Sequence, residues 1–149
     1  MTEISRAITQ KSFQSPQQEA IISLMLVSQQ VKSKLENLCE TEKITLAQFN
    51  ILRILKGIYP EAHPRAEIRK RMIDKSDVTR LIDRLENRGL VRRICAEKDK
   101  RHSLTVITNE GIELLERLNV KFPQAHDNIL EKFTKPQVLS LIHLLKKFV

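Results

Sequence analysis

Residues 74–91 read DKSDVTRLIDRLENRGLV, and this stretch decides the fold. Its large apolar residues follow one another at steps of three and four, which places them on one face of a helix: Val78, Leu81, Ile82 and Leu85. Asp74 is a residue type that caps helix starts, and Gly89 stands where a left-handed residue would end the helix. The pattern therefore predicts an amphipathic helix from Asp74 to Arg88. Its other face is polar and charged: Lys75, Ser76, Thr79, Arg80, Asp83 and Arg84.

Two short runs rich in β-branched residues follow the predicted helix, at residues 90–95 and 103–107. Between them lies the charged segment AEKDKRH, residues 96–102, so the runs predict a β-hairpin with a charged tip. The chain has only three Gly and five Pro, which is few for a fold with many strand reversals. We therefore expect a mainly α protein, and this hairpin is the only β structure that the sequence predicts.

Short helices are expected before this stretch. Thr45 and Gln48 form a capping-box pattern at the start of a largely buried helix that ends near Gly57. A connector with two prolines follows, because a proline disfavours helix in the residue before it. A further short helix is expected from Pro64 to about Met72.

Longer amphipathic segments lie toward the two ends of the chain. Ser15 and Pro16 predict the start of one helix, Thr108 the start of another with a kink at Pro123, and Thr134 the start of a last one. Their inward stripes are Ile21, Leu24, Met25, Ser28, Val31, Leu35 and Leu38; Ile112, Leu115, Leu118, Phe122, Ile129 and Phe133; and Val138, Leu141, Ile142, Leu145 and Phe148. So short a chain offers few internal partners for this much apolar surface. We therefore expect a second copy of the same protein to cover it.

The charge of the chain points to a polyanionic partner. Lys and Arg number 26 against 18 Asp and Glu, which gives a formal net charge of +8. Residues 63–108 hold nine Arg and four Lys against three Glu and four Asp, so six of the eight excess charges lie in the middle third. No run approaches the roughly 18 apolar residues of a membrane-spanning helix, and residues 1–14 lack the apolar segment of a signal peptide. We therefore expect a cytoplasmic protein that binds nucleic acid.

Other classes of chemistry find little support in the sequence. Cys39 and Cys95 stand in unrelated settings, and neither they nor the four histidines show the spacing of metal ligands. We expect both cysteines to be reduced packing residues, with no metal and no cofactor. The sequence also offers no Ser/His/Asp set, phosphate-binding glycine loop or paired carboxylates, which argues against an enzyme.

A short helix, a turn, an amphipathic helix and a basic hairpin in this order are typical of a winged helix-turn-helix. The second helix of such a pair fits the major groove of DNA, where the base pairs present different edges. We expect Arg80 to read a base, because arginine can pair bidentately with guanine. The candidate DNA-binding residues are Lys75, Ser76, Asp77, Thr79, Arg80 and Arg84 on the helix and Lys98, Lys100, Arg101 and His102 on the wing.

Two acidic residues in this region are expected to serve the protein rather than the bases. Asp99 would orient Arg101 by an ion pair, because phosphates repel a carboxylate that faces them. Asp83 is expected to take part in helix capping or in pairing one turn away on its own helix.

These residues resemble the MarR family of bacterial regulators. The resemblance rests on Asp77–Val91, on Asp99-Lys100-Arg101 and on Ile107–Gly111, and it spans roughly residues 46–115. It implies a homodimer with two winged lobes on a pseudo-palindromic DNA operator, and a repressor that a small aromatic or anionic effector releases. Lys100 departs from the family's usual Asp-Arg-Arg wing motif, so bidentate geometry is lost there and Arg101 takes the minor-groove role.

We therefore expect a single domain over residues 1–149, mainly α, with about six helices and a two-stranded β-hairpin wing. Residues 15–40 and 109–149 would be dimerisation helices, and residues 45–108 the winged helix-turn-helix lobe. Two functions stay open: an operator-binding transcription regulator, and a winged-helix module that binds protein or RNA. The single Tyr and five Phe offer little surface for stacking bases, which favours duplex DNA.

Overall fold

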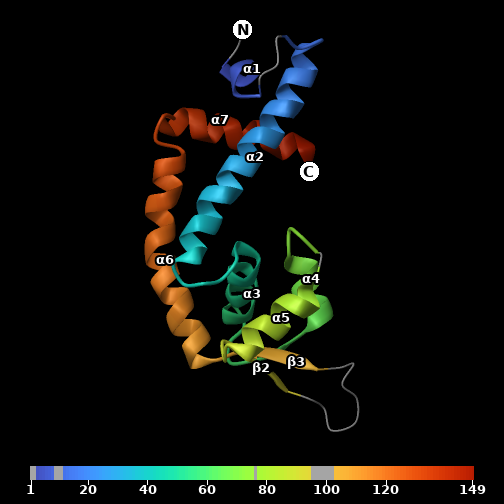
Figure 1. The fold of residues 1–149 in the computed structure, drawn as a ribbon, viewed down its shortest axis with the longest axis vertical. Coiled ribbons are helices and arrows are strands. Elements are labelled where there is room, and N and C mark those ends of the chain that lie inside the picture. Colours follow the sequence, from blue (N-terminus) through green and yellow to red (C-terminus); the bar gives the residue numbers. More distant parts are fainter. Residues whose placement is uncertain (1–2, 9–11, 76, 95–102) are drawn as a thin grey trace.

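The computed structural model describes residues 3–8, 12–75, 77–94 and 103–149 (Figure 1). In chain order its elements are α1 (Glu3–Ala7), α2 (Pro16–Glu40), α3 (Leu46–Lys56), β1 (His63–Pro64), α4 (Arg65–Arg71), α5 (Val78–Asn87), β2 (Val91–Ile94), β3 (Leu104–Ile107), α6 (Asn109–Ile129), α7 (Lys135–Leu145) and the 3-10 turn η2 (Lys146–Phe148). The structure is mainly helical with a small antiparallel sheet, which confirms the predicted fold class.

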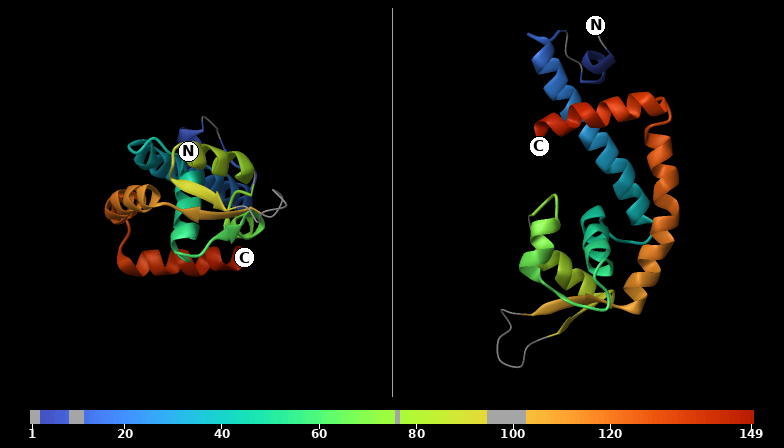
Figure 2. Two further views of the ribbon diagram at one scale, coloured as in Figure 1. Left: turned by 90° about the horizontal axis from the view of Figure 1, so that it is seen from below. Right: turned by 180° about the vertical axis from the view of Figure 1, so that it is seen from behind.

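The molecule has two parts that lie at opposite ends (Figure 1). Helices α3, α4 and α5 and the sheet form a compact lobe, which we call the winged lobe. Helices α2, α6 and α7 extend away from it, and α2 and α7 cross at the far end in both the front and the back view (Figure 2). Both chain termini lie at that far end. None of the helices in the described ranges is both long and apolar enough to cross a membrane.

Three of the helix starts that the sequence predicts, those of α2, α3 and α6, have the expected capping hydrogen bonds. The Ser15 hydroxyl accepts a hydrogen bond from the Gln18 backbone N–H at 3.2 Å at the start of α2. At α3, Thr45 and Gln48 exchange reciprocal hydrogen bonds of 3.1 and 2.9 Å, which satisfies two backbone donors that the helix itself leaves open. At α6, the Thr108 hydroxyl accepts from the Gly111 N–H at 3.1 Å. These caps fix where three of the helices begin.

The start of α5 differs from the prediction. The helix begins at Val78 rather than at Asp74, because Asp77 adopts a left-handed conformation with φ 53° that interrupts a helix. Lys75 consequently lies in the turn before the helix and not on it. The end of α5 is as expected, since Gly89 has φ 70° and reverses the chain into β2.

The sheet contains a strand that the sequence analysis assigned to a connector. β1 pairs antiparallel with β3, with His63 opposite Thr105, and β3 also pairs with β2, with Val91 opposite Ile107. The order β1-β3-β2 makes β3 the central strand. A two-residue strand containing a proline carries no periodic signal, so only the partner strand could reveal it.

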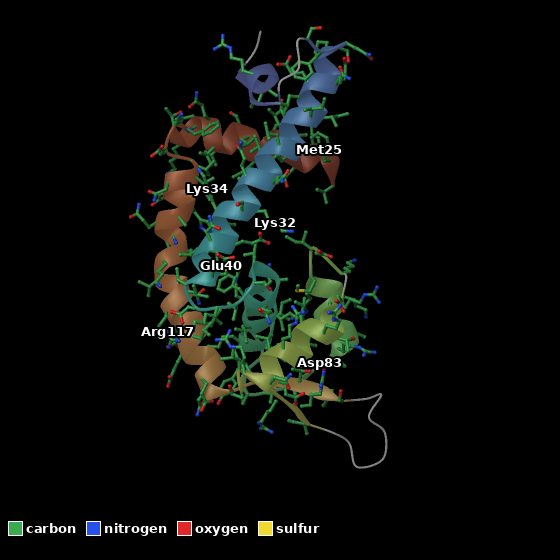
Figure 3. All side chains as sticks on the ribbon, viewed as in Figure 1. Met25, Lys32, Lys34, Glu40, Asp83 and Arg117 are labelled. Atoms are coloured by element: carbon green, nitrogen blue, oxygen red, sulfur yellow. The ribbon has the colours of Figure 1, made fainter. Side chains whose placement is uncertain are left out.

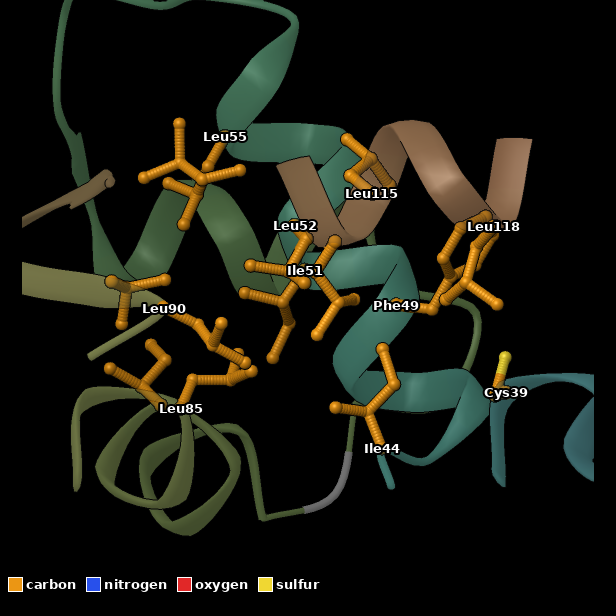
Figure 4. Close-up of a cluster of buried hydrophobic side chains, with 14 of the residues drawn as sticks. Cys39, Ile44, Phe49, Ile51, Leu52, Leu55, Leu85, Leu90, Leu115 and Leu118 are labelled. Atoms are coloured by element: carbon orange, nitrogen blue, oxygen red, sulfur yellow. The ribbon is translucent and has the colours of Figure 1, made fainter. Parts of the chain in front are cut away.

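One hydrophobic core joins the two parts of the molecule (Figure 4). It is built from α3, the inner face of α5, the sheet and the lower half of α6, and its fully buried side chains include Phe49, Ile51, Leu52, Leu55, Ile82, Leu85, Leu115 and Leu118. Cys39, at the end of α2, is completely buried in this core. Burial raises the pKa of its thiol to about 11, with a smaller contribution from Glu36, so the thiol stays protonated and unreactive at neutral pH.

The stripes of the terminal helices are buried only in part. Helix α6 continues through Pro123 and buries Leu115, Leu118 and Phe122, but it ends at Ile129, so Phe133 lies beyond it. The predicted inward stripe of α7 is wrong for the single chain, because three of its five members are exposed: Ile142, Leu145 and Phe148. On α2 the exposed apolar residues gather in the half nearer its start: Ile21, Leu24, Met25 and Val27. The described part of the chain leaves these positions open to solvent.

Candidate nucleic-acid interface

Helix α5 presents a polar face to solvent and an apolar face to the core. Val78, Ile82 and Leu85 are at most 4% exposed, so they fix the orientation of the helix on the winged lobe. The candidate DNA-binding residues of the turn and helix that the structure describes are all exposed: Lys75, Asp77, Thr79, Arg80 and Arg84. A helix held by one face with its other face open can enter a major groove without rearrangement.

Arg80 and Asp77 form an ion pair at the first turn of α5. The Arg80 Nη1 lies 3.1 Å from the Asp77 Oδ2, and both side chains are at least half exposed. An exposed pair of this kind contributes little to stability, but it restricts the rotamers that the guanidinium visits. The structure thus gives Asp77 a protein partner, where the sequence analysis listed it beside Arg80 as a DNA contact.

Two arginines of α4 reach across to the residues around the start of α5. Arg65 donates from Nη1 to the Thr79 hydroxyl at 3.1 Å, and Arg69 donates from Nε to the Lys75 carbonyl oxygen at 3.2 Å. Neither residue was predicted as a site residue from the sequence, although their four-residue spacing would place them on one face of α4. They bring two further cations next to the recognition face.

Arg93 of β2 connects the wing to α5. Its guanidinium pairs with Asp83 and, at 2.7 Å, with Glu86, while its backbone N–H donates to Glu86 Oε1 at 3.0 Å. The hydrogen bond to Asp83, which Figure 3 labels on α5, raises the pKa of the guanidinium above its ordinary value, so the residue stays charged. The expectation that Asp83 pairs within its own helix is wrong, because its partner comes from the neighbouring strand. Arg93 is thus a basic residue of the hairpin whose charge is already paired within the protein.

The far end of α5 is held by the turn between α2 and α3. Arg88 donates to the backbone carbonyl oxygens of Lys43 and Glu42, the latter at 3.1 Å. The Glu42 carboxylate in turn accepts from Arg117 of α6 at 3.1 and 3.0 Å. These hydrogen bonds from Arg117 lower the pKa of Glu42 below its ordinary value. A continuous set of polar contacts therefore links the recognition helix to α6.

The tip of the predicted wing lies outside the described residues. This applies to Lys98, Asp99, Lys100, Arg101 and His102, and also to Ser76 and Cys95. The two strands that carry the tip are in place, and Arg92 on β2 is exposed beside the paired Arg93.

A recognition helix with an open polar face, a helix packed across its start and a two-stranded basic hairpin define a winged helix-turn-helix DNA-binding protein. Comparisons with known proteins give the family. The sequence profile of the MarR family matches residues 44–103. The chain is 33% identical to the multiple antibiotic resistance protein MarR of Escherichia coli K12 over 109 residues, which cover 70% of this chain and 72% of that protein. The chain belongs to the MarR family and is a DNA-binding transcription regulator rather than an enzyme.

Two further relatives agree with this assignment. The homoprotocatechuate degradative operon repressor of Escherichia coli is 27% identical over 129 residues, 86% of each protein. The crystal structure of a cysteine-to-serine mutant of MarR from Escherichia coli, complexed with operator DNA, superposes with a TM-score of 0.74 at 28% identity, over 87% of this chain and 96% of that one.

Proposed function

We propose that the protein is a homodimeric repressor that binds a pseudo-palindromic operator through α5 and the wing and is released by a small effector. The observation that carries this proposal is the exposed polar face of α5, held by buried contacts on one side and by Arg65, Arg69, Arg88 and Arg93 at its edges. In the proposed complex Arg80 reads a base, while Lys75, Ser76, Thr79 and Arg84 contact bases or phosphates nearby. Lys98, Lys100, Arg101 and His102 bind the adjacent minor groove and its phosphates, with Asp99 orienting Arg101.

A second copy is the proposed cover for the exposed apolar surface at the end farthest from the winged lobe. Met25 is 69% exposed on α2, Leu139 is 58% exposed on α7 and Phe148 is 72% exposed in η2. Side chains of this size are rarely left open to water in number, and α2 and α7 both extend to the end of the molecule away from the winged lobe (Figures 1 and 2). A two-fold pair joined there would carry two winged lobes, as a pseudo-palindromic operator requires. In this division residues 15–40 and 109–149 dimerise and residues 45–108 bind DNA.

The proposed effector site is a cavity of about 330 Å³ between α2 and the winged lobe. Val31, Lys32 and Leu35 line it from α2, Leu46 and Ala47 from α3, and Met72 and Ile73 from the turn that leads to α5. Figure 3 labels Lys32 on this side of α2. The volume and the apolar walls fit a small aromatic molecule. Lys32 could pair with an acidic group on it, although the lining also holds Asp74 and Glu36, and Glu36 lies 3.8 Å from the Lys32 ammonium group. A molecule bound there would contact both parts of the protein and so change how far apart the two lobes of a dimer lie.

A gel-shift experiment separates this function from the alternative of a protein- or RNA-binding module. The purified protein is mixed with duplexes from its own genome and with RNA of the same sequences, in the presence of excess heparin. Retention of a subset of duplexes is expected. Binding of RNA alone, or loss of all complexes to heparin, would contradict operator binding.

The effector site can be tested with the same complexes. Val31→Trp places a large side chain in the cavity without altering the DNA-binding face. A panel of aromatic carboxylates is expected to include one that releases wild-type protein from the operator and leaves Val31→Trp bound. Equal release of both proteins would place the effector elsewhere.

A further inference from the structure

The winged lobe contains a polar cleft of about 520 Å³ between the recognition helix and the wing. Arg65 lines it from α4, Thr79 from the exposed face of α5, and Ser103 from the residue that precedes β3; Asp83, Glu86 and Arg93 form its remaining polar wall. We infer that this cleft holds one backbone phosphate of the operator, with Arg65 as its principal ligand. The inference rests on the proposed function and adds a site to it, at a residue that reads no base.

Arg65 is suited to a phosphate by its geometry and its partners. Its side chain is exposed, and one of its guanidinium nitrogens donates to the Thr79 hydroxyl at 3.1 Å. Across the described ranges, no carboxylate lies within ion-pair distance of it, so its other N–H groups are open to a ligand. A guanidinium fixed at one edge presents its remaining donors as a fork, which matches two oxygens of a phosphate.

The hydroxyl groups of the cleft complete the site. Thr79 receives the hydrogen bond from Arg65 through its oxygen, so its own proton is free to point toward an anion. Ser103 brings a second hydroxyl from the wing side of the cleft. In the proposed complex α5 enters the major groove and the hairpin reaches the adjacent minor groove. The DNA backbone runs between these two grooves, so a phosphate bound in the cleft would lie between the helix and the hairpin.

The two acidic residues of the cleft share one partner, the guanidinium of Arg93. Asp83 and Glu86 would repel a phosphate if they were unpaired, but both carboxylates form ion pairs with the same guanidinium. Arg93 therefore offsets one of the two negative charges in the wall of the cleft, and Arg65, which pairs with neither carboxylate, supplies the positive charge that attracts the phosphate. The two arginines have different roles: Arg65 is a ligand, and Arg93 is a positioning residue.

The test is a missing-contact experiment with ethylated operator. Duplex carrying one ethylated phosphate per molecule is separated into bound and free fractions with wild-type protein, Arg65→Ala and Arg65→Lys. Lys70→Ala is the matched control, because Lys70 lies on the same helix, pairs with Glu67 at 2.7 Å and does not line the cleft. One phosphate per half-site is expected to block wild type and Lys70→Ala when ethylated, and to have no effect on Arg65→Ala.

The salt dependence of binding provides a second readout. Loss of one phosphate contact lowers the slope of log Kobs against log salt by about 0.9 per chain, equally for every duplex sequence. Arg65→Lys is expected to keep most of this slope, because it keeps the charge, while losing part of the affinity. A purely structural role would lower the melting temperature of Arg65→Ala and leave its ethylation pattern and slope like those of wild type; that result would overturn the inference. If wild-type protein binds no duplex, the proposed function fails first, and the phosphate site fails with it.

Discussion

Arg80 combines an exposed guanidinium with an ion-pair partner on the protein itself, Asp77. It lies in the first turn of α5 with 67% of its side chain exposed, and it pairs with Asp77, the N-cap residue of the helix. Asp77 has a left-handed backbone and is the N-cap residue of α5, so its side chain lies at the start of the helix. We infer that Asp77 limits the directions in which Arg80 can point before DNA arrives.

Replacing Arg80 should therefore change specificity more than general affinity for DNA. Arg80→Ala is expected to cost about 1 to 3 kcal/mol of binding free energy at one base pair per half-site, because a bidentate contact to a base edge is lost. Fluorescence anisotropy with operators altered one base pair at a time measures this. At the contacted position, wild type should discriminate between bases and Arg80→Ala should not. Undiminished discrimination by the variant at every position would show that Arg80 reads no base.

Two glycines near the wing differ in what they require. A Cβ at Gly111 would collide with the Leu90 carbonyl oxygen and lie 2.8 Å from Ile107 Cγ1, so α6 can pack against this part of the chain only without a side chain there. A Cβ at Gly89 would meet nothing within 4 Å, and only the positive φ of 70° disfavours it.

Substituting alanine at both glycines separates these two effects. Gly89→Ala is expected to cost roughly 1 to 2 kcal/mol of unfolding free energy, the penalty of a left-handed residue with a Cβ. Gly111→Ala should cost about 3 kcal/mol or more, because backbone atoms would have to move. Urea denaturation followed by circular dichroism gives both values. Equal losses would mean that α6 can shift away from Leu90.

At the scale of elements, the connection between the recognition helix and α6 runs through one residue, Glu42. Glu42 accepts two hydrogen bonds from Arg117, and its backbone carbonyl accepts one from Arg88. Figure 3 labels Arg117 on α6, beside the end of α2. These hydrogen bonds hold the turn after α2 to the end of α5 and to α6.

The lowered pKa of Glu42 predicts how this connection responds to pH. Since the pKa is lower in the folded protein than in the unfolded chain, the stabilisation is present above the unfolded value near 4.5 and is lost as pH falls from there through the folded value. Glu42→Gln should melt below wild type at pH 7, and the two melting temperatures should converge as the pH is lowered below 4.5. A difference that does not change over this pH range would show that the charge of Glu42 adds nothing.

The elements follow from the sequence to different degrees. Capping residues and three- and four-residue apolar steps are local signals, so the starts of α2, α3 and α6 and the buried face of α5 could be predicted. The start of α5 depends on the backbone of Asp77, and β1 depends on β3, which lies forty residues further along the chain. Neither leaves a local pattern.

The residues of the candidate DNA-binding site could likewise be predicted only where the sequence signal is local. The exposed residues of α5 follow from its periodicity, so the recognition face could be predicted. The contacts of Arg65 with Thr79 and of Arg93 with Asp83 join residues 14 and 10 positions apart on different elements. Tertiary packing therefore decides which basic side chains are paired within the protein and which are left open to bind DNA.

At the scale of the whole molecule, the exposed apolar residues of α2 and α7 are the main feature that one chain leaves unexplained. Met25, which Figure 3 labels on the exposed half of α2, makes little contact within the chain at 69% exposure. It is therefore a position where a charge should disturb association and leave the fold of the monomer intact.

Met25→Asp is expected to convert a dimer into monomers in sedimentation velocity, because a carboxylate would be buried in an apolar interface. Operator affinity should fall by about 100-fold or more, since a monomer engages only one half-site at a time. The control is Glu113→Lys, an exposed change of charge at the winged-lobe end of α6, which should remain dimeric. A dimeric Met25→Asp would rule out this face as the interface.

Sequence-specific operator binding is tested most sharply by the ratio of two dissociation constants. One is for a duplex selected by the protein from its genome, and the other is for a shuffled duplex of the same length and composition, both measured by anisotropy at physiological salt. A helix face that reads bases in two half-sites predicts a ratio of at least about 10³, with two chains per duplex. Equal dissociation constants would contradict it, because the protein would then bind DNA only as a polyanion.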